Sequence, residues 1–381
     1  MTTSHHVLPD ARPAGQHLPA PPPPHTAPAP TGNPTSHRAE RAAPWWTPSG
    51  VDHNRINLAF FYDACREAKN SDNRDVSCVK FAHDNELDAA LLLDARVPGA
   101  RAVFRSERAF LDRAAAYLVA RQGVSSIVVA GAGLPHITGD DDLHSVVRLR
   151  ERATRNRTQN TSRANVIYVE RDPLTLAHLR TIADPDNGVH VVEADPWDPT
   201  AMWDTLYNTT SESPGLVSRD DDHVALLLGG VMSFHGGSRA EVAQVVQDHF
   251  ARLPDGAFLA MTHLLVPDHS EMIAQAREFE TALRIYGPGT GSLATRGEIE
   301  AMIAGTNVVT PGIVPAFGWY PEGPPNPPVC GHFAAAVLAQ KPGPDNDLPE
   351  PPWRPQPEAA GRARSCPAPA APRSPRSSTR V

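Results

Sequence analysis

Long hydrophobic segments are absent from this sequence, and its apolar runs fall far short of the roughly 18 residues of a membrane-spanning helix. The first residues, MTTSHHVLPDARPAG, contain no basic stretch followed by an apolar one, which a secretory signal would require. The four cysteines, Cys65, Cys78, Cys330 and Cys366, show neither a metal-type pairing nor a disulfide framework. We therefore expect a soluble cytoplasmic protein without a membrane partner or a metal centre.

Apolar side chains are scarce at both ends of the chain. Residues 1–49 carry 12 of the 40 prolines, residues 342–381 carry 11 more, and both segments are short of Ile, Val, Leu and Phe. Such segments cannot bury enough apolar surface to offset the entropy of ordering. We predict that both termini are disordered and proline-rich. The part between them suits one α/β domain or a domain with a small lobe.

Positive charge is scarce in this middle part. The whole chain has a net charge of −8, while the first 49 residues contribute +1 and the segment from 342 onward contributes +2, which leaves −11 for the middle. Non-specific nucleic-acid binding needs a basic surface, so we expect no nucleic-acid partner. The arginines of the C-terminal segment suit either a solvated segment without a binding role or contact with an anionic partner.

From about residue 100 the sequence alternates between the periodicities of helices and strands. The segment SERAFLDRAAAYLVARQG predicts a helix with Ser106 as N-cap and Gly123 as its stop, and one apolar face made of Phe110, Leu111, Ala114, Ala115 and Leu118. Further helices are expected over 141–153, 172–183, 239–253, 270–286 and 295–304, the second of them capped by Asp172.

Seven strands are expected between these helices, over 127–130, 166–170, 189–195, 223–231, 256–265, 308–314 and 333–340. The segment 223–231 is the most apolar, so we place it in the centre of the sheet, buried on both faces. Strand–helix alternation predicts a doubly wound, mostly parallel α/β sheet. Ligands of such sheets lie beyond the carboxyl ends of the strands.

A glycine-containing turn follows the first of these strands. In SIVVAGAGLPH, Gly131 and Gly133 come directly after the apolar run, and glycine permits both positive φ and close approach of a ligand to the backbone. The same turn also suits mere packing between a strand and a helix. The dinucleotide pattern G-x-G-x-x-G is incomplete, because its sixth position is His136.

Two acidic residues end the next two strands. Glu170 ends the second strand, where a carboxylate can accept hydrogen bonds from both hydroxyls of an adenosine ribose. We expect this carboxylate to face solvent when no ligand is bound. Asp195 ends the third strand, where it can accept from the adenine amine while Pro196 or Trp197 covers the ring.

Each of these acids alone has a simpler explanation, an exposed charge for Glu170 and a turn cap for Asp195. Together with the glycine turn, they point to an adenosine-bearing ligand. Their order favours S-adenosylmethionine over a nicotinamide dinucleotide, which would need a pyrophosphate cradle and a second mononucleotide half.

Seven blocks carry a resemblance that extends from about Asn54 to Lys341. They are, in order, FRSERAFLDRAAAYL, GAGLPH, VIYVERDPLTLAHLR, VEADPWDP, VALLLGGVMSF, LPDGAFLAMTH and the final segment from RGEIEAMI to GWYPEG. With these blocks the chain resembles a family of S-adenosylmethionine-dependent methyltransferases that was long catalogued as a domain of unknown function. The resemblance implies a class I methyltransferase sheet with an N-terminal helical cap and a reversed last strand.

On this resemblance the chain divides into a tail (1–49), a helical cap (50–120), a Rossmann-like S-adenosylmethionine-binding domain (121–341) and a second tail (342–381). The predicted partner is a small-molecule methyl acceptor, and the oligomeric state stays open. The predicted cofactor-binding residues are Gly131, Ala132, Gly133, Leu134, Glu170, Arg171, Asp195, Pro196, Trp197 and Gly229.

This chain departs from the family pattern at three places. The family usually has an acid where this chain has Val129, and an Asn where it has Glu107. After FFYDA, the segment CREAKNSDN lacks the glycines that the family has there. These changes favour one alternative to an active enzyme, a methyltransferase-fold protein that binds an adenosine ligand as a regulatory module.

Methyl transfer from a sulfonium is an in-line displacement, so the protein mainly positions the reactants. A base is needed only where the acceptor must lose a proton. His235 after the fourth strand and His263 within the fifth are the candidates for this base, although each also suits a structural role. A nicotinamide-dependent oxidoreductase is the third alternative, and the incomplete glycine pattern disfavours it.

Overall fold

A computed structural model of the chain describes residues 55–66, 84–135, 142–155, 163–208, 215–221, 223–320 and 327–343. The prediction for the segment 1–49 lies outside the described residues, and so does nearly all of the prediction for 342–381. His136, at the end of the glycine turn, lies outside them as well.

Helices and strands alternate along the described chain as expected. The helices are α1 (Leu58–Arg66), α2 (Asp84–Arg96), α3 (Arg101–Arg121), α4 (Leu143–Arg155), α5 (Pro173–Leu179), α6 (Pro199–Tyr207), α7 (Arg239–Arg252), α8 (Ser270–Tyr286) and α9 (Arg296–Met302). The strands are β1 (Ser126–Ala130), β2 (Asn165–Glu170), β3 (Val189–Glu193), β4 (Val224–Gly229), β5 (Phe258–Leu264), β6 (Asn307–Val308), β7 (Val314–Pro315) and β8 (Ala334–Gln340).

The strands form one mixed sheet in the order β3-β2-β1-β4-β5-β8-β6, and β7 also pairs with β8. The first five strands pair in parallel, and β8 runs antiparallel to β5. This confirms the doubly wound, mostly parallel fold and the reversed last strand. In β4 the side chains from Val224 to Leu228 are all fully buried, as its continuous apolar run predicted.

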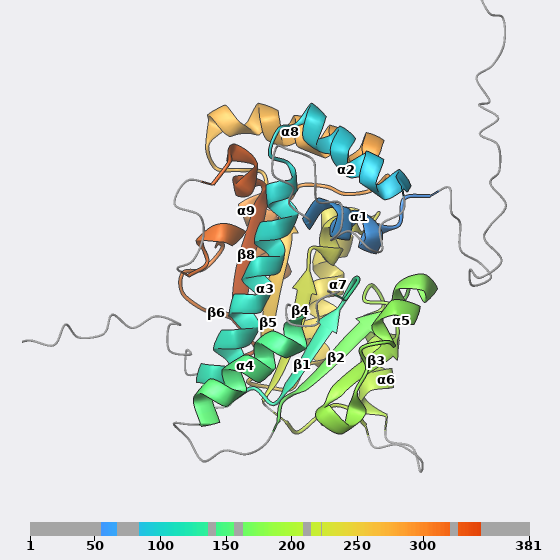
Figure 1. Ribbon diagram of the computed structural model, residues 1–381. Coiled ribbons are helices and arrows are strands. Elements are labelled where there is room, and N and C mark those ends of the chain that lie inside the picture. The colour runs from blue at the N-terminus through green and yellow to red at the C-terminus, as the bar shows by residue number, and fades with distance from the viewer. Residues whose placement is uncertain are drawn as a thin grey trace, which may run out of the picture. The chain divides into compact units, whose positions relative to one another are not determined.

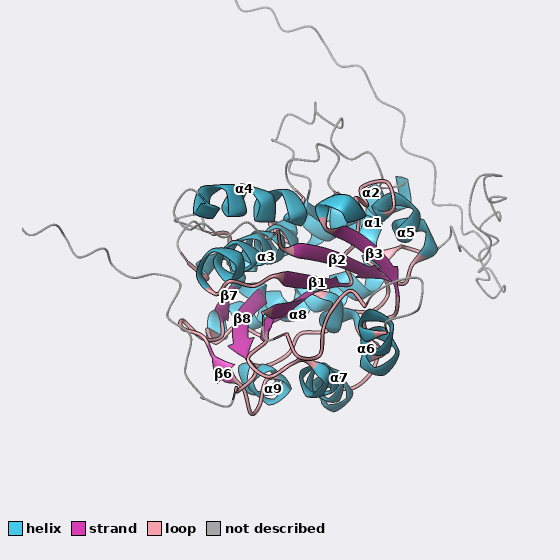
Figure 2. Ribbon diagram, turned by 90° about the horizontal axis from the view of Figure 1, so that it is seen from below, coloured by secondary structure: helices cyan, strands magenta, loops and turns pink. Residues whose placement is uncertain are grey.

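Helices cover both faces of the sheet, and each face has its own apolar core. One core joins α3 and α4 with alternate strand residues such as Ile127 and Leu227, and it extends to α1, α2 and α8. The other joins α6, α7 and α9 with the intervening strand residues such as Val128 and Leu226. Figure 2 shows α3 and α4 on one side of the sheet and α6, α7 and α9 on the other.

Local sequence signals fix several of the helix ends. The Asp172 side chain accepts a hydrogen bond from the Thr175 N–H at 2.8 Å and caps α5, as predicted. Ser238 and Thr295 each form a capping box with a glutamate three residues later, at the start of α7 and of α9. The apolar residues of α3 that were predicted to share a face are all buried, and Gly123 follows the helix with a φ of +68°.

Two details of the prediction are wrong. Helix α3 begins at Arg101, five residues before the predicted cap, and the Ser106 hydroxyl instead donates to the Val103 carbonyl within the helix at 2.7 Å. The single strand expected over 308–314 is split into β6 and β7, so the sheet has eight strands among the described residues. Pro311 and Gly312 separate the two short strands, and neither residue favours a continuous strand.

Helices α1 and α2 lie beyond the end of the sheet toward which β1 and β4 point (Figure 1). With α3 they make up the described part of the predicted cap, although α3 also packs along one face of the sheet. The domain boundary at residue 120 stays a prediction. Within the described ranges, none of the helices combines the length and the hydrophobicity that crossing a membrane requires.

The central position of β4 leads to a stability prediction. Leu227→Ala should lower the free energy of unfolding by about 2–5 kcal/mol, because the side chain is fully buried and its loss leaves a cavity. Leu91→Ala, at a residue of α2 that is 58% exposed, is the matched control and should change it by less than about 0.5 kcal/mol. Urea unfolding measures both, and equal losses would contradict the central placement of β4.

Candidate functional site

A cavity of about 460 Å³ lies at the carboxyl ends of β1, β2 and β4 and beside the loop that follows β3. Its opposite wall comes from α1, α2, α3 and the loop after α8. Such a volume is in the range of small-molecule and cofactor sites. Nine of the ten predicted cofactor residues line it: Gly131, Ala132, Gly133, Leu134, Glu170, Arg171, Pro196, Trp197 and Gly229.

The two glycines of the turn after β1 have different roles. Both have a φ of +69°. A Cβ atom at Gly131 would lie 2.7 Å from a methyl group of Val231, whereas a Cβ at Gly133 would have no atom within 4 Å. Gly131 is therefore required by packing, and Gly133 leaves open space at the cavity wall. Gly131 thus supports the packing interpretation of the turn, whereas ligand approach at Gly133 stays a prediction.

Glu170 holds this turn to the start of α5. One of its oxygens accepts from the N–H groups of Arg171 and Asp172, at 2.8 and 3.2 Å, and the other accepts from the Gly133 N–H at 3.2 Å. A carboxylate offers about four acceptor positions, so one of them remains without a donor from these backbone groups.

The expectation that this carboxylate faces solvent is wrong. Glu170 is only 8% exposed, because the turn and the start of α5 close around it. Burial raises the pKa of Glu170 above its ordinary value, although the three N–H donors oppose this shift. The side chain is therefore part of the architecture of the strand end as well as of the cavity wall.

Asp195 organises the next strand end without lining the cavity. One oxygen accepts from the Trp197 N–H at 2.9 Å, and the other accepts from the Arg171 guanidinium at 2.8 Å. The guanidinium lies over the Trp197 ring, 4.1 Å from its centroid. The indole N–H in turn donates to the Val231 carbonyl at 3.2 Å. Asp195 thus holds two residues that line the cavity, and its predicted contact with an adenine amine stays a prediction.

The two candidate bases lie outside the cavity lining. The His235 ring packs edge-on against Trp197 at 5.4 Å, and its Nδ1 accepts from the Gly237 N–H. His263 is buried, and its Nε2 lies 3.0 Å from a nitrogen of Arg239, which can only donate. Nδ1 therefore carries the proton and donates to the Leu264 carbonyl at 2.8 Å.

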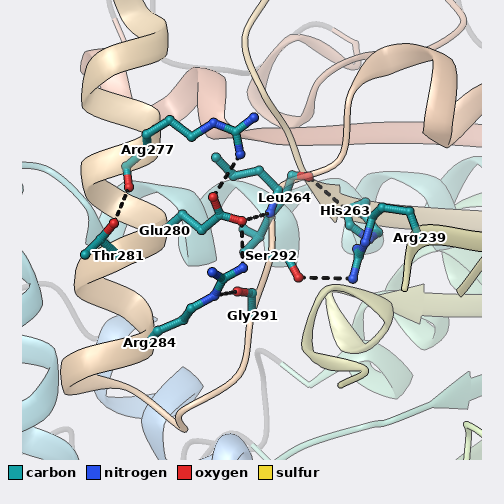
Figure 3. Close-up of polar contacts among 10 residues, drawn as sticks. Arg239, His263, Leu264, Arg277, Glu280, Thr281, Arg284, Gly291 and Ser292 are labelled. Carbon is teal, nitrogen blue, oxygen red and sulfur yellow. Dashed lines mark hydrogen bonds and ion pairs between the residues drawn. The ribbon is translucent and has the colours of Figure 1, made fainter. Parts of the chain in front are cut away.

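Both nitrogens of His263 are thus engaged within the fold, and burial lowers its pKa to about 4. Figure 3 shows the contact of His263 with the Leu264 carbonyl and, beside it, the hydrogen bond between Arg239 and Ser292. The structure does not bring either histidine to the cavity, and their catalytic role finds no support in this geometry.

A second polar network anchors the loop that completes the cavity wall. Glu280 of α8 accepts from Arg277 at 2.9 Å, from Arg284 at 3.0 Å and from the Leu293 N–H at 3.0 Å. Arg284 also donates to the Gly291 carbonyl at 3.0 Å (Figure 3). These contacts tie the C-terminal end of the short segment that contributes Pro288 and Thr290 to the cavity back to α8.

Glu107 of α3 was not among the predicted cofactor-binding residues, although the family resemblance implied that this departure falls near the amino-acid half of the cofactor and the lid. It lines the cavity, is 2% exposed and accepts a hydrogen bond from the Tyr62 hydroxyl at 3.0 Å. Burial raises the pKa of Glu107 from its ordinary 4.5 to about 7, against the opposing effect of the hydrogen bond from Tyr62 and of the neighbouring Thr262 hydroxyl. Val129, the other departure at this end of the site, also lines the cavity and gives it an apolar surface.

The signal for this part of the wall was present in the sequence. Phe104, Glu107, Arg108 and Leu111 follow the spacing of one helical face, and all four line the cavity. The same spacing describes a face buried in a core, so periodicity alone could not separate the two. A glutamate within such a face was the distinguishing feature.

The different roles of Gly131 and Gly133 can be tested with alanine. Positive φ costs alanine about 1–2 kcal/mol at either position. Gly131→Ala should lower the melting temperature further than Gly133→Ala, because only its Cβ would collide with Val231. Adding Val231→Ala should recover part of the loss of Gly131→Ala but none of the loss of Gly133→Ala. Equal effects of both glycine substitutions would contradict the assignment.

The raised pKa of Glu107 leads to a prediction about stability and pH. Its pKa is higher in the folded chain than in the unfolded one, so ionisation of Glu107 destabilises the fold as the pH rises toward and through 7. Glu107→Gln cannot ionise. Relative to wild type it should gain up to about 3 kcal/mol between about pH 5 and about pH 8. Urea unfolding without ligand at both pH values measures this, and a constant difference would contradict it.

Comparisons with known proteins agree with this geometry. A sequence model of the family described as S-adenosyl methyltransferase matches residues 79–342, which is more than half of the chain. A search of curated proteins found no match.

Two crystal structures share the fold. A candidate methyltransferase from Thermobifida fusca is 23% identical with a TM-score of 0.61, and the alignment covers 79% of this chain and 100% of that one. A protein of the DUF574 family from Streptomyces avermitilis is 20% identical with a TM-score of 0.60, over 76% and 98% of the two chains. At these identities the two structures support the fold alone. Because the family model spans most of the chain, this protein belongs to the S-adenosyl methyltransferase family.

Proposed function

We propose that this protein is an S-adenosylmethionine-dependent methyltransferase that acts on a small molecule. The observation that carries the proposal is the position of Glu170. Its buried carboxylate lines a cavity at the strand ends, between a glycine turn with open space at Gly133 and the tryptophan that Arg171 covers.

The residues present fit the adenosine part of such a cofactor. Glu170 keeps one acceptor position for a ribose hydroxyl, and no side chain fills the space at Gly133. Pro196 and Trp197 supply flat apolar surface for a base, and the Asp195–Arg171 pair holds the indole in place. When bound, S-adenosylmethionine supplies the reactive methyl group on its sulfonium.

The protein itself binds and orients the cofactor and the methyl acceptor, and it excludes water from them. The strand ends form one wall of the cavity, and α1, α2, α3 and the anchored loop form the other. A methyl acceptor that enters this space must therefore be small. The acidic middle of the chain also makes a nucleic acid an unsuitable acceptor.

The alternative is a protein that binds an adenosine ligand for regulation rather than catalysis. Val129 favours it, because an apolar side chain lines the cavity where the family resemblance implies an acid. Both alternatives require the same adenosine contacts, so binding is the first property to test.

Removing the Glu170 carboxylate should weaken cofactor binding. Glu170→Ala deletes a charge-assisted acceptor worth roughly 1.5–3 kcal/mol, so the affinity for S-adenosylmethionine should fall about ten- to a hundredfold. The same change leaves three backbone N–H groups without their acceptor, so the melting temperature should fall as well. Isothermal titration and thermal melts measure the two effects.

Glu193→Ala is the matched control. Glu193 ends β3 directly beside Glu170 in the register, but its carboxylate is exposed and pairs with Arg180. This variant should keep both affinity and stability. Wild-type affinity in Glu170→Ala would remove Glu170 from the site. Absence of binding of both S-adenosylmethionine and S-adenosylhomocysteine to the wild type would overturn the proposed function.

A further inference from the structure

The strand order lays the site residues out in a line along one edge of the sheet. Trp197 follows β3, Glu170 ends β2, Gly131 follows β1 and Gly229 ends β4, in the spatial order β3-β2-β1-β4. Neighbouring strands are about 4.8 Å apart, so this line is about 14 Å long. An adenosyl ligand with its base at Trp197 and its ribose at Glu170 therefore extends its amino-acid part toward β1 and β4.

Glu107 lies at the β4 end of this line. A Cβ atom at Gly230 would be 3.1 Å from the Glu107 carboxyl oxygen Oε1 and 2.1 Å from the Tyr62 hydroxyl. Gly230 itself has a φ of +71°. The backbone at the end of β4 thus passes directly below the pair of side chains, which come from α3 and α1.

The carboxyl group of Glu107 has unused acceptor positions. Oε2 accepts from Tyr62, while Oε1 is buried and makes no hydrogen bond of good geometry. The Thr262 hydroxyl is a further polar neighbour of the carboxyl group. Among the described residues no lysine, arginine or histidine forms an ion pair with it. Burying an ionised carboxylate in this way costs free energy unless a cation forms an ion pair with it.

We propose that Glu107, oriented by the Tyr62 hydroxyl, accepts the α-ammonium group of the adenosyl ligand. The assignment rests on the proposed function, because it takes the ligand to be S-adenosylmethionine or its product. The ammonium group carries three donors and a positive charge, which matches the oxygen without a hydrogen-bond partner and the missing counter-ion.

A second buried carboxyl group in the cavity helps to define the assignment. Glu86 of α2 also lines the cavity and also has an oxygen without a partner. Its other oxygen accepts from the Asn57 N–H at the start of α1, at 3.0 Å. Glu86 therefore belongs to the helical wall, whereas Glu107 lies over the end of β4, where the line of ligand contacts leads.

Two ligands separate this contact from the adenosine contacts. S-adenosylhomocysteine carries the ammonium group, and methylthioadenosine has the same nucleoside and sulfur without the amino-acid part. Glu107→Gln keeps the size of the side chain and removes its charge. This substitution should weaken the affinity for S-adenosylhomocysteine about ten- to a hundredfold. It should change the affinity for methylthioadenosine less than about threefold. Glu86→Gln, the matched control, should leave the ratio of the two affinities unchanged.

The pH dependence gives an independent measurement. A bound ammonium group favours ionised Glu107, so the affinity of the wild type for S-adenosylhomocysteine should rise through about pH 7, and binding should release a proton. Both effects should be absent for methylthioadenosine and for Glu107→Gln. In Tyr62→Phe the midpoint should move to higher pH, because the Tyr62 hydrogen bond lowers the pKa of Glu107 and its loss lets that pKa rise.

The outcomes distinguish the two proposals. Failure of the wild type to bind either ligand overturns the proposed function, and this assignment with it. If the wild type binds both, equal losses in Glu107→Gln, or no loss, overturn only the role of Glu107. The role of Glu107 is also overturned if Glu86→Gln weakens the affinity for S-adenosylhomocysteine but not the affinity for methylthioadenosine. Thermal melts of each variant ensure that folded protein is compared.

Discussion

The parallel register of β1, β2, β3 and β4 is the constraint on which the site depends. Ala130 pairs with Val169 on one side and with Leu228 on the other, and Glu170 pairs with Glu193. The strands therefore end at nearly the same level, and the residues that follow them meet along one edge. A shift of one residue in any pairing would turn the side chains to the opposite face. The cores on both faces of the sheet prevent such a shift in β1, β2 and β4, because the side chains of these three strands are buried on both faces.

Two buried carboxyl groups lie along this edge, and the fold treats them differently. Glu170 receives three backbone N–H groups, which hold its position before any ligand arrives. Glu107 accepts one hydrogen bond of good geometry, from a hydroxyl group, and its other oxygen has no hydrogen-bond partner. The first is satisfied mainly by the protein, whereas the second lacks a counter-ion among the described residues. The difference follows from location, since a strand end offers free N–H groups and the middle of a helix offers none.

Much of this fold could be predicted from the sequence because its signals are local. Apolar runs located the parallel strands, and Asp172 marked the start of a helix through its cap. The position of Glu170 after a strand was enough to bring it to the cavity. Its burial was not predictable, because it depends on the N–H of Gly133, which lies 37 residues away in the chain. The division of labour between Gly131 and Gly133 likewise depends on a distant side chain, that of Val231.

The wall opposite the strand ends was the least predictable part. Its residues come from α1, α2, α3 and the loop after α8. The family resemblance predicted a helical cap over 50–120, but no local signal in the sequence relates this cap to the loop after α8. The contact between Tyr62 and Glu107 joins two of them, and the network around Glu280 fixes the loop. These are polar contacts between residues far apart in sequence, for which no periodicity exists.

The two walls of the cavity meet at Gly230, where a larger residue could not be accommodated. Its missing side chain lets the Tyr62 hydroxyl approach the end of β4, and the same hydroxyl orients Glu107. A single glycine at a strand end thus brings the helical wall down onto the sheet edge. A Cβ atom at Gly230 would lie 2.1 Å from the Tyr62 hydroxyl and would push Tyr62 and α1 away from β4. The geometry around Glu107 consequently depends on the backbone of the sheet as much as on its own helix.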